Sequence, residues 1–159
     1  MRPLLDTHTL CWAIYKPHLL TVEAAHAVAD RSNPVSATLT SAQEIALKLG
    51  VGKWPGALDP LLHFDAHVAA ADYSLIAPTA LDYANALWLP DIPGHRDLFD
   101  RLIIAQAMAR GMTLVTSDPC APRYDVPVIV AGRAERSTEA RGGRVVPEGR
   151  LTPIPPPEA

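Results

Sequence analysis

Short apolar runs alternate with amphipathic segments along the first 130 or so residues of the chain. The apolar runs predict strands at 2–5, 34–37, 74–78, 113–118 and 126–131, and the segments between them predict helices at 7–16, 21–31, 41–50, 59–72, 79–89 and 98–110. Alternation of strand and helix is typical of a parallel sheet covered by helices. The pattern therefore predicts an α/β domain built on a central, mostly parallel five-stranded sheet.

Residues at the ends of three segments predict where these helices begin and end. Ser41 is placed to cap helix 41–50, Asp59 and Pro60 occupy the N-cap and N1 positions of helix 59–72, and Gly111 ends helix 98–110. The segment 90–97, "PDIPGHRD", contains two prolines and a glycine and is predicted to be a loop.

The composition changes after this pattern ends. Residues 133–159 contain five arginines and five prolines and almost no periodic apolar residues. Such a segment buries too little apolar surface to fold by itself. We therefore predict a folded domain at 1–131 and a flexible, Pro/Arg-rich C-terminal tail at 132–159.

Charge and cysteine content narrow the functional class. The chain of 159 residues has 14 Lys+Arg, 17 Asp+Glu and a net charge of -3, so charge alone does not indicate a nucleic-acid-binding protein. Its two cysteines form no CxxC pair, which disfavours a disulfide framework. The start does not resemble a signal peptide, and no apolar segment approaches the length of a membrane span. We expect a cytoplasmic protein that does not bind a membrane.

Two aspartates directly follow predicted strands. Asp6 ends "PLLD" and Asp118 ends "TLVTSD". Each has an ordinary structural explanation, since Asp6 can cap helix 7–16 and Asp118 can form an Asp-Pro turn. Because ligands of open α/β sheets bind beyond the carboxyl ends of the strands, both side chains are also candidate site residues.

Two further acids lie near helix starts. Asp100 shares a helical face with Ile103 and Ile104, which are expected to be packed, so its charge is costly there unless it has a partner. Glu44 follows Ser41 by three residues and could belong to a capping box. Four carboxylates in one cleft would repel one another unless a cation neutralises them. Mg²⁺ or Mn²⁺ fits such oxygen ligands and favours phosphodiester hydrolysis by an activated water.

The residues quoted so far, in this order and spacing, resemble PIN-domain ribonucleases, in particular the VapC-like toxins of type II toxin–antitoxin pairs. The similarity runs through "LLDTHTLCWA", "SAQEIALKLGVGKWPGAL", "PDIPGHRDLFDRLIIAQAMARGMTLVTSDP" and "YDVPVIVA" and covers about the first 130 residues. It implies a three-layer α/β/α domain, a metal-dependent endoribonuclease, a homodimer and a cognate antitoxin. Its RNA substrate could be tRNA or another structured RNA.

The resemblance also implies roles for particular residues. The metal-binding and catalytic acids of the family fall on Asp6, Glu44, Asp100 and Asp118. Thr116 or Ser117 stands where the family often has a hydroxyl beside the fourth acid. The tail from Arg133 onward departs from the family, so nothing is inferred for it.

Residues beside the acids are candidates for substrate contacts or supporting roles. Arg96, Arg101 and Lys48 could bind phosphate or be solvated surface charges. Asp97 is expected to cap helix 98–110. Asp59, His63 and His67 have zinc-like spacing, but a solvated helix face is the preferred explanation.

Two alternative functions remain open at this level. One is a catalytically weak PIN-like module that binds an antitoxin or RNA without cutting. The other is an α/β protein with a different acid pocket, such as a phosphatase or a phosphotransfer receiver. The haloacid-dehalogenase type of phosphatase needs a D-x-D after its first strand, whereas this chain has "DTH" there.

Overall fold

A computed structural model describes residues 1–132, and five short parallel strands form the centre of this region. The strands are β1 (Pro3–Leu5), β2 (Ser36–Thr38), β3 (Ser74–Ile76), β4 (Thr113–Thr116) and β5 (Val128–Val130). Each matches a predicted strand, so the α/β class and the five-stranded sheet are confirmed. Every neighbouring pair is parallel.

The strand order is β3-β2-β1-β4-β5. Leu4 of β1 pairs with Ser36 on one side and with Leu114 on the other. The chain therefore leaves β1 toward β2 and β3, then returns to the other side of β1 to form β4. Such a reversal is a topological switch point, where side chains at the carboxyl ends of the two strands face an open crevice.

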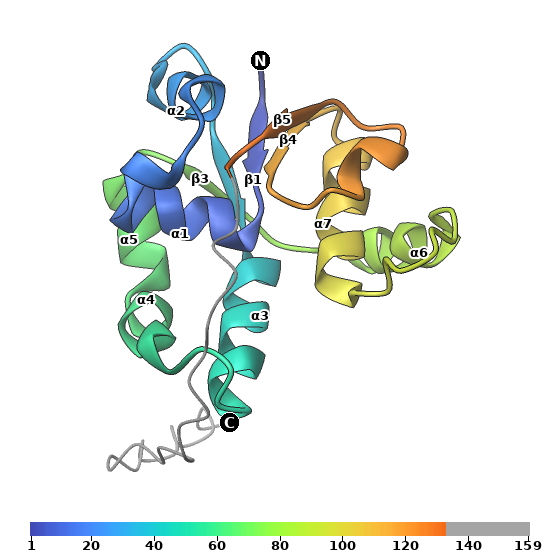
Figure 1. Ribbon diagram of the computed structural model, residues 1–159, viewed down its shortest axis with the longest axis horizontal. Helices are drawn as coiled ribbons and strands as arrows, with labels where there is room; N and C mark the ends of the chain where they lie inside the picture. Colours follow the sequence, from blue (N-terminus) through green and yellow to red (C-terminus); the bar gives the residue numbers. More distant parts are fainter. Residues whose placement is uncertain (133–159) are drawn as a thin grey trace, which may run out of the picture.

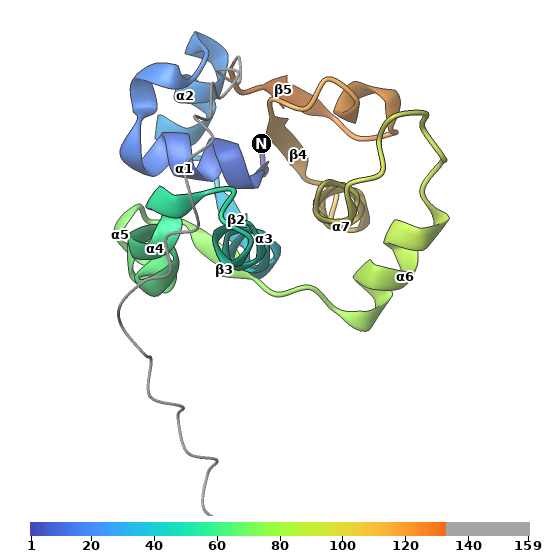
Figure 2. The ribbon, with the colours of Figure 1, turned by 60° about the horizontal axis from the view of Figure 1, so that its bottom comes forward.

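Seven α-helices cover the sheet within the described residues. They are α1 (Thr7–Tyr15), α2 (Val22–Ala29), α3 (Leu39–Gly50), α4 (Leu58–Leu62), α5 (Phe64–Ala70), α6 (Ala80–Trp88) and α7 (Leu98–Ala109). Three 3-10 turns add to them: η1 (Pro17–Leu19), η2 (Pro55–Ala57) and η3 (Ala121–Arg123). Figures 1 and 2 show α1, α2, α4 and α5 on one side of the sheet and α6 and α7 on the other. This is the predicted three-layer α/β/α arrangement.

Alternating strand residues supply two separate cores. Leu5 and Val115 pack with residues of α1, α2, α3 and α5, whereas Leu4 and Leu114 pack with residues of α7. The four side chains are at most 2% exposed. Successive residues of a strand point to opposite faces, so "PLL" and "TLV" fill both cores.

Two predicted helix starts are wrong. Helix α3 begins at Leu39 because the Thr38 side chain accepts from Thr40 N–H, which places Ser41 inside the first turn rather than at the cap. Asp59 and Pro60 do not open a helix, because α4 already begins at Leu58, directly after η2.

The predicted helix 59–72 is broken in two. It is interrupted at His63, which is the C-cap of α4 and the N-cap of α5. In contrast, Gly111 follows α7 with φ +59°, the left-handed conformation for which glycine is suited at a helix end. The predicted end of α7 is thereby confirmed.

A bidentate ion pair ties α6 to α7. Arg110 donates to both carboxylate oxygens of Asp82, at 2.7 and 2.8 Å. Asp82 is 2% exposed and also completes a capping box with Thr79 at the start of α6. Hydrogen bonding from Arg110 lowers the pKa of Asp82 to about 2. This pair joins α6 to α7, which lies between α6 and the strands (Figure 2).

None of the helices in the described part of the chain is long and apolar enough to cross a membrane. The predicted C-terminal tail lies outside the described residues, apart from its first position, Gly132.

Candidate metal centre

Three of the four predicted acids meet at the switch point between β1 and β4. Asp6, Asp100 and Asp118 line one pocket, together with the hydroxyl-bearing Thr116. Asp6 directly follows β1, Asp118 lies two residues beyond β4, and Asp100 is in the first turn of α7. The wall behind them is apolar and is made by Ile103, Ile104 and Leu114.

Asp6 caps α1, as predicted, and it also lines the pocket. One carboxylate oxygen accepts from Thr9 N–H at 2.7 Å, which caps α1. The other oxygen accepts from the buried hydroxyl of Thr116. The cap and the hydroxyl hold the carboxylate at the pocket instead of letting it turn into solvent.

Asp118 is held in a similar way. Its Oδ1 accepts from Cys120 N–H at 2.9 Å, which is the turn expected of an aspartate before proline. Its backbone N–H donates to Thr116 Oγ1 at 3.0 Å. Thr116 therefore joins the two strand-end acids, while Asp118 Oδ2 is buried and has no hydrogen-bond partner.

Asp97 caps α7, as predicted, whereas Asp100 lines the pocket. Asp97 is the N-cap of α7 and accepts from the N–H groups of Phe99 and Asp100 at 2.9 and 3.4 Å. Asp100 faces the pocket, and its side chain remains 36% exposed. Removal from water, followed by repulsion from neighbouring acids that include Asp97 and Glu44, raises the pKa of Asp100 to about 8. A carboxyl group in this setting gains stability when a cation binds beside it.

Glu44 takes a position that the sequence did not predict. The capping-box explanation is wrong because Thr38, not Ser41, caps α3. The Glu44 side chain is 3% exposed; it accepts a hydrogen bond from the Thr7 hydroxyl and pairs with Lys48 Nζ at 2.5 Å. Glu44 is near enough to raise the pKa of Asp100, but it does not line the pocket. Its charge is already partly balanced by Lys48.

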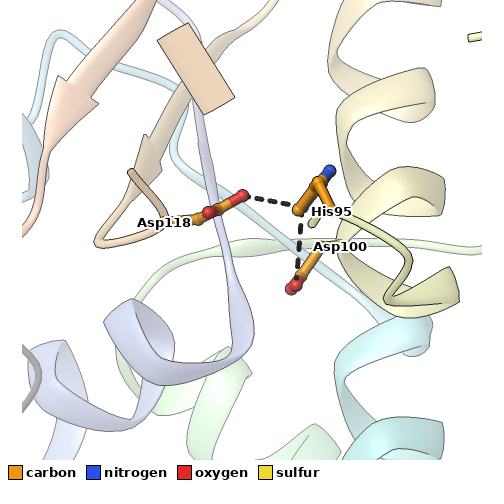
Figure 3. A group of neighbouring side chains, drawn as sticks. All are labelled: His95, Asp100 and Asp118. Atoms are coloured by element: carbon orange, nitrogen blue, oxygen red, sulfur yellow. Dashed lines mark ion pairs between the residues drawn. The ribbon is translucent and has the colours of Figure 1, made fainter. Parts of the chain in front are cut away.

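His95 is the residue that sequence reasoning missed. Its Nε2 lies 2.8 Å from Asp118 Oδ2 and 3.7 Å from Asp100 Oδ2 (Figure 3). Its Nδ1 lies 2.7 Å from the Tyr124 hydroxyl, and the side chain is 5% exposed. Arg96 and Asp97 of the predicted loop 90–97 were candidate residues because of their charge. His95 belongs to no periodic pattern or motif that would have identified it.

These side chains fit a divalent cation. His95, Asp100 and Asp118 each offer one ligand atom, and these atoms lie within 4.8 Å of one another. His95 Nε2 and Asp118 Oδ2 are buried without hydrogen-bond partners, whereas buried polar atoms are rarely left unpaired. Asp100 and Asp118 beside these atoms, with Asp6 lining the same pocket, provide the hard oxygen ligands that Mg²⁺ and Mn²⁺ use.

Comparison with known proteins shows the fold. No protein-family model and no curated protein matches the chain. The crystal structure of VapBC2 from Rickettsia felis bound to a DNA fragment from their promoter contains a similar chain, with TM-score 0.58 and 19% identity over 82% of this chain and 99% of that one. The chain has a PIN-like fold. A second structure, FitAcB from Neisseria gonorrhoeae, gives TM-score 0.47 and 19% identity over 80% of this chain and 96% of that one.

The predicted phosphate-binding cations of this PIN-like domain lie in different settings. The Arg101 guanidinium donates to the backbone carbonyls of Ala86, Leu89 and Pro90 and to the Tyr124 hydroxyl. Arg101 thus secures the end of α6 and the loop that carries His95. Arg96 is exposed one residue after His95, where it is free to approach a ligand.

Two other candidate features lie outside the pocket. The Ser117 hydroxyl is buried without a hydrogen-bond partner and does not line the pocket, so the hydroxyl beside the fourth acid is that of Thr116. Asp59 lies 3.7 Å from both His63 and His67, but the Asp59 and His63 side chains are 71% and 61% exposed. The solvated face is therefore confirmed for Asp59 and His63. It is not confirmed for His67, whose side chain is 32% exposed and whose Nε2 is buried without a hydrogen-bond partner.

Proposed function

We propose that this chain is a metal-dependent endoribonuclease that acts in the cytoplasm as the toxin of a type II toxin–antitoxin pair. The observation that carries the proposal is the convergence of Asp6, Asp100 and Asp118 in one pocket at the sheet's switch point. The likeness of fold to a chain of the VapBC2 structure supports the same reading.

In this proposal Asp6, Asp100 and Asp118 hold Mg²⁺ or Mn²⁺. Such an ion activates a water and balances the charge that develops on a phosphodiester. Thr116 keeps the Asp6 carboxylate turned to the pocket. Glu44 acts from behind the pocket through its charge and through its hydrogen bond from Thr7. The exposed Arg96 is suited to contact an RNA phosphate.

A second candidate is a catalytically weak PIN-like module that grips RNA or an antitoxin without cutting. One observation favours it: Lys48 pairs with Glu44 at 2.5 Å, so only three of the four predicted acids face the pocket. Three carboxylates are sufficient for a metal site that keeps several waters, so the enzyme remains the preferred function.

Metal removal tests the enzyme proposal. Because the carboxylates by themselves supply no electrophile, we expect the purified chain to cut RNA in Mn²⁺ or Mg²⁺, to stop in EDTA and to regain activity when excess metal is restored. RNA fragments are resolved by gel electrophoresis after separation of the protein from any co-purifying partner. Cleavage that continues undiminished in EDTA would rule out the metal mechanism, and binding without cleavage in either metal would favour the second candidate.

The proposal includes a cognate antitoxin and a homodimer. Four large apolar side chains of α6 and the start of α7 are exposed: Leu81, Leu87, Trp88 and Leu98 are 62%, 78%, 77% and 74% exposed. Large exposed apolar side chains are candidates for protein–protein contacts. We propose that a second copy of the chain binds this α6–α7 surface. The antitoxin would then bind at the acid pocket.

Light scattering tests the dimer. We expect the wild-type chain to have twice the mass of one copy and Trp88→Ser to shift it toward the monomer, because a large exposed aromatic is a typical interface anchor. The fold of each copy should keep its stability, since Trp88 is outside both cores, so any fall in melting temperature should come from loss of the dimer alone. A wild-type monomer at all concentrations would contradict the dimer, and an unchanged dimer in Trp88→Ser would place its interface elsewhere.

A further inference from the structure

His95 is buried, yet one of its ring nitrogens faces the aspartates of the pocket. Nε2 approaches Asp118 Oδ2 to 2.8 Å, but neither atom has a hydrogen-bond partner. The short approach is therefore not an aligned N–H···O hydrogen bond. When Nε2 carries its lone pair, the nitrogen and the carboxylate oxygen repel each other at this distance, and a cation bound between them removes that repulsion.

The distances suit a shared cation. Metal–ligand bonds of about 2.1 Å bring two ligand atoms to about 3 Å from each other at right angles and to about 4 Å when they are opposite. His95 Nε2 lies 2.8 Å from Asp118 Oδ2 and 3.7 Å from Asp100 Oδ2, within this range. His95 thus stands at ligand distance from two of the three aspartates.

The other ring nitrogen is held as expected for a metal-binding histidine. Nδ1 lies 2.7 Å from the Tyr124 hydroxyl, and Arg101 donates to the same hydroxyl at 3.3 Å. When Nδ1–H donates to that oxygen, Nε2 carries the lone pair and points at the acids. A partner of this kind fixes both the tautomer and the orientation of a histidine ligand.

We propose that His95 Nε2 is a direct ligand of the divalent ion, together with Asp100 and Asp118, and that this mixed site binds Mn²⁺ in preference to Mg²⁺. Imidazole is a good ligand for transition metals, whereas Mg²⁺ favours carboxylate, carbonyl and water oxygens. Arg101 and Tyr124 then act as positioning residues for the ligand. The inference rests on the proposed metal centre and adds a nitrogen ligand and a metal preference to it.

Pulsed electron paramagnetic resonance of the untagged, full-length chain loaded with Mn²⁺, without RNA, tests this ligand. We expect hyperfine coupling from a coordinated imidazole nitrogen in the wild type and its loss in His95→Gln. The matched control is His8→Gln, because His8 lies two residues from Asp6 but stacks on Trp54, with ring centroids 5.2 Å apart. This variant should keep the coupling.

Calorimetric titration with each metal supplies the second readout. His95→Gln is expected to weaken Mn²⁺ binding by about tenfold or more and Mg²⁺ binding by less, so that the preference for Mn²⁺ shrinks. Bound Mn²⁺ without nitrogen coupling in the wild type would overturn the inference and leave the metal centre standing. No binding of Mn²⁺ to the wild type would overturn both. The wild-type spectrum alone shows whether a histidine nitrogen binds the ion, even if the variant does not fold.

Discussion

Replacement of Asp100 by Asn is expected to abolish metal-dependent RNA cleavage, with a loss of at least about a hundredfold, because a metal ligand contributes several kcal/mol to the charge balance at the reacting phosphate. Asp100 faces the pocket, and its pKa is raised to about 8 by burial and by neighbouring acids. Asparagine keeps the shape of the side chain but cannot ionise to bind the cation. The variant should therefore fold.

Asp97→Asn is the matched control for this prediction. Asp97 caps α7 through hydrogen bonds from Phe99 and Asp100 N–H, and asparagine is also a good cap. We expect a loss of unfolding free energy of about 1 kcal/mol or less, with measurable cleavage retained. Single-turnover cleavage rates and thermal melts separate the two effects. An inactive Asp97→Asn beside an active Asp100→Asn would show that the wrong aspartate of "HRDLFDR" has been assigned to the metal.

Replacement of Arg110 by Met is expected to cost about 3 kcal/mol of unfolding free energy, because it leaves the Asp82 carboxylate buried without its bidentate partner. Urea unfolding at pH 7 measures the loss. Arg31→Met is the control: Arg31 is exposed, so its replacement should change stability by less than about 0.5 kcal/mol. A loss in Arg110→Met no larger than the control's would mean that the pair does not hold α6 to α7.

The Asp82–Arg110 pair should make the stability of the fold fall at acidic pH. The pKa of Asp82 is lowered from 3.8 to about 2 in the folded chain, so the pair stabilises the fold above the unfolded-state value of 3.8. That contribution is lost as the pH falls from about 4 toward 2. The stability difference between wild type and Arg110→Met should therefore shrink over this range. A difference that stays constant from pH 7 to pH 3 and below would contradict the assignment.

The elements that could be predicted from sequence are those set by local pattern. The runs "PLL" and "TLV" alternate between two cores, which is why both were identifiable as buried strands. The acids after them could be predicted to meet because parallel strands end at the same edge of a sheet. Asp97 and Asp100 could be told apart because Asp97 stands at the cap position, whereas Asp100, three residues later in the first turn, shares a helical face with Ile103.

The remaining features depend on tertiary contacts that leave no local pattern. His95 reaches the pocket because Tyr124 and Arg101, from distant parts of the chain, hold its loop in place. Glu44 matched a capping box by spacing, but Thr38 starts the helix three residues earlier, and this places Glu44 beside Thr7. The break between α4 and α5 likewise could not be predicted, because the residue at the break is a histidine and not a glycine or proline.

We propose that Asp6, Asp100 and Asp118 hold a divalent ion at the switch point of the sheet. Anomalous diffraction from crystals of the chain soaked in Mn²⁺ tests it most directly, since the signal locates the ion without assuming its ligands. We expect a strong peak between these three carboxylates, and its loss in Asp100→Asn crystals. A peak at another place, or none at saturating Mn²⁺, would contradict it.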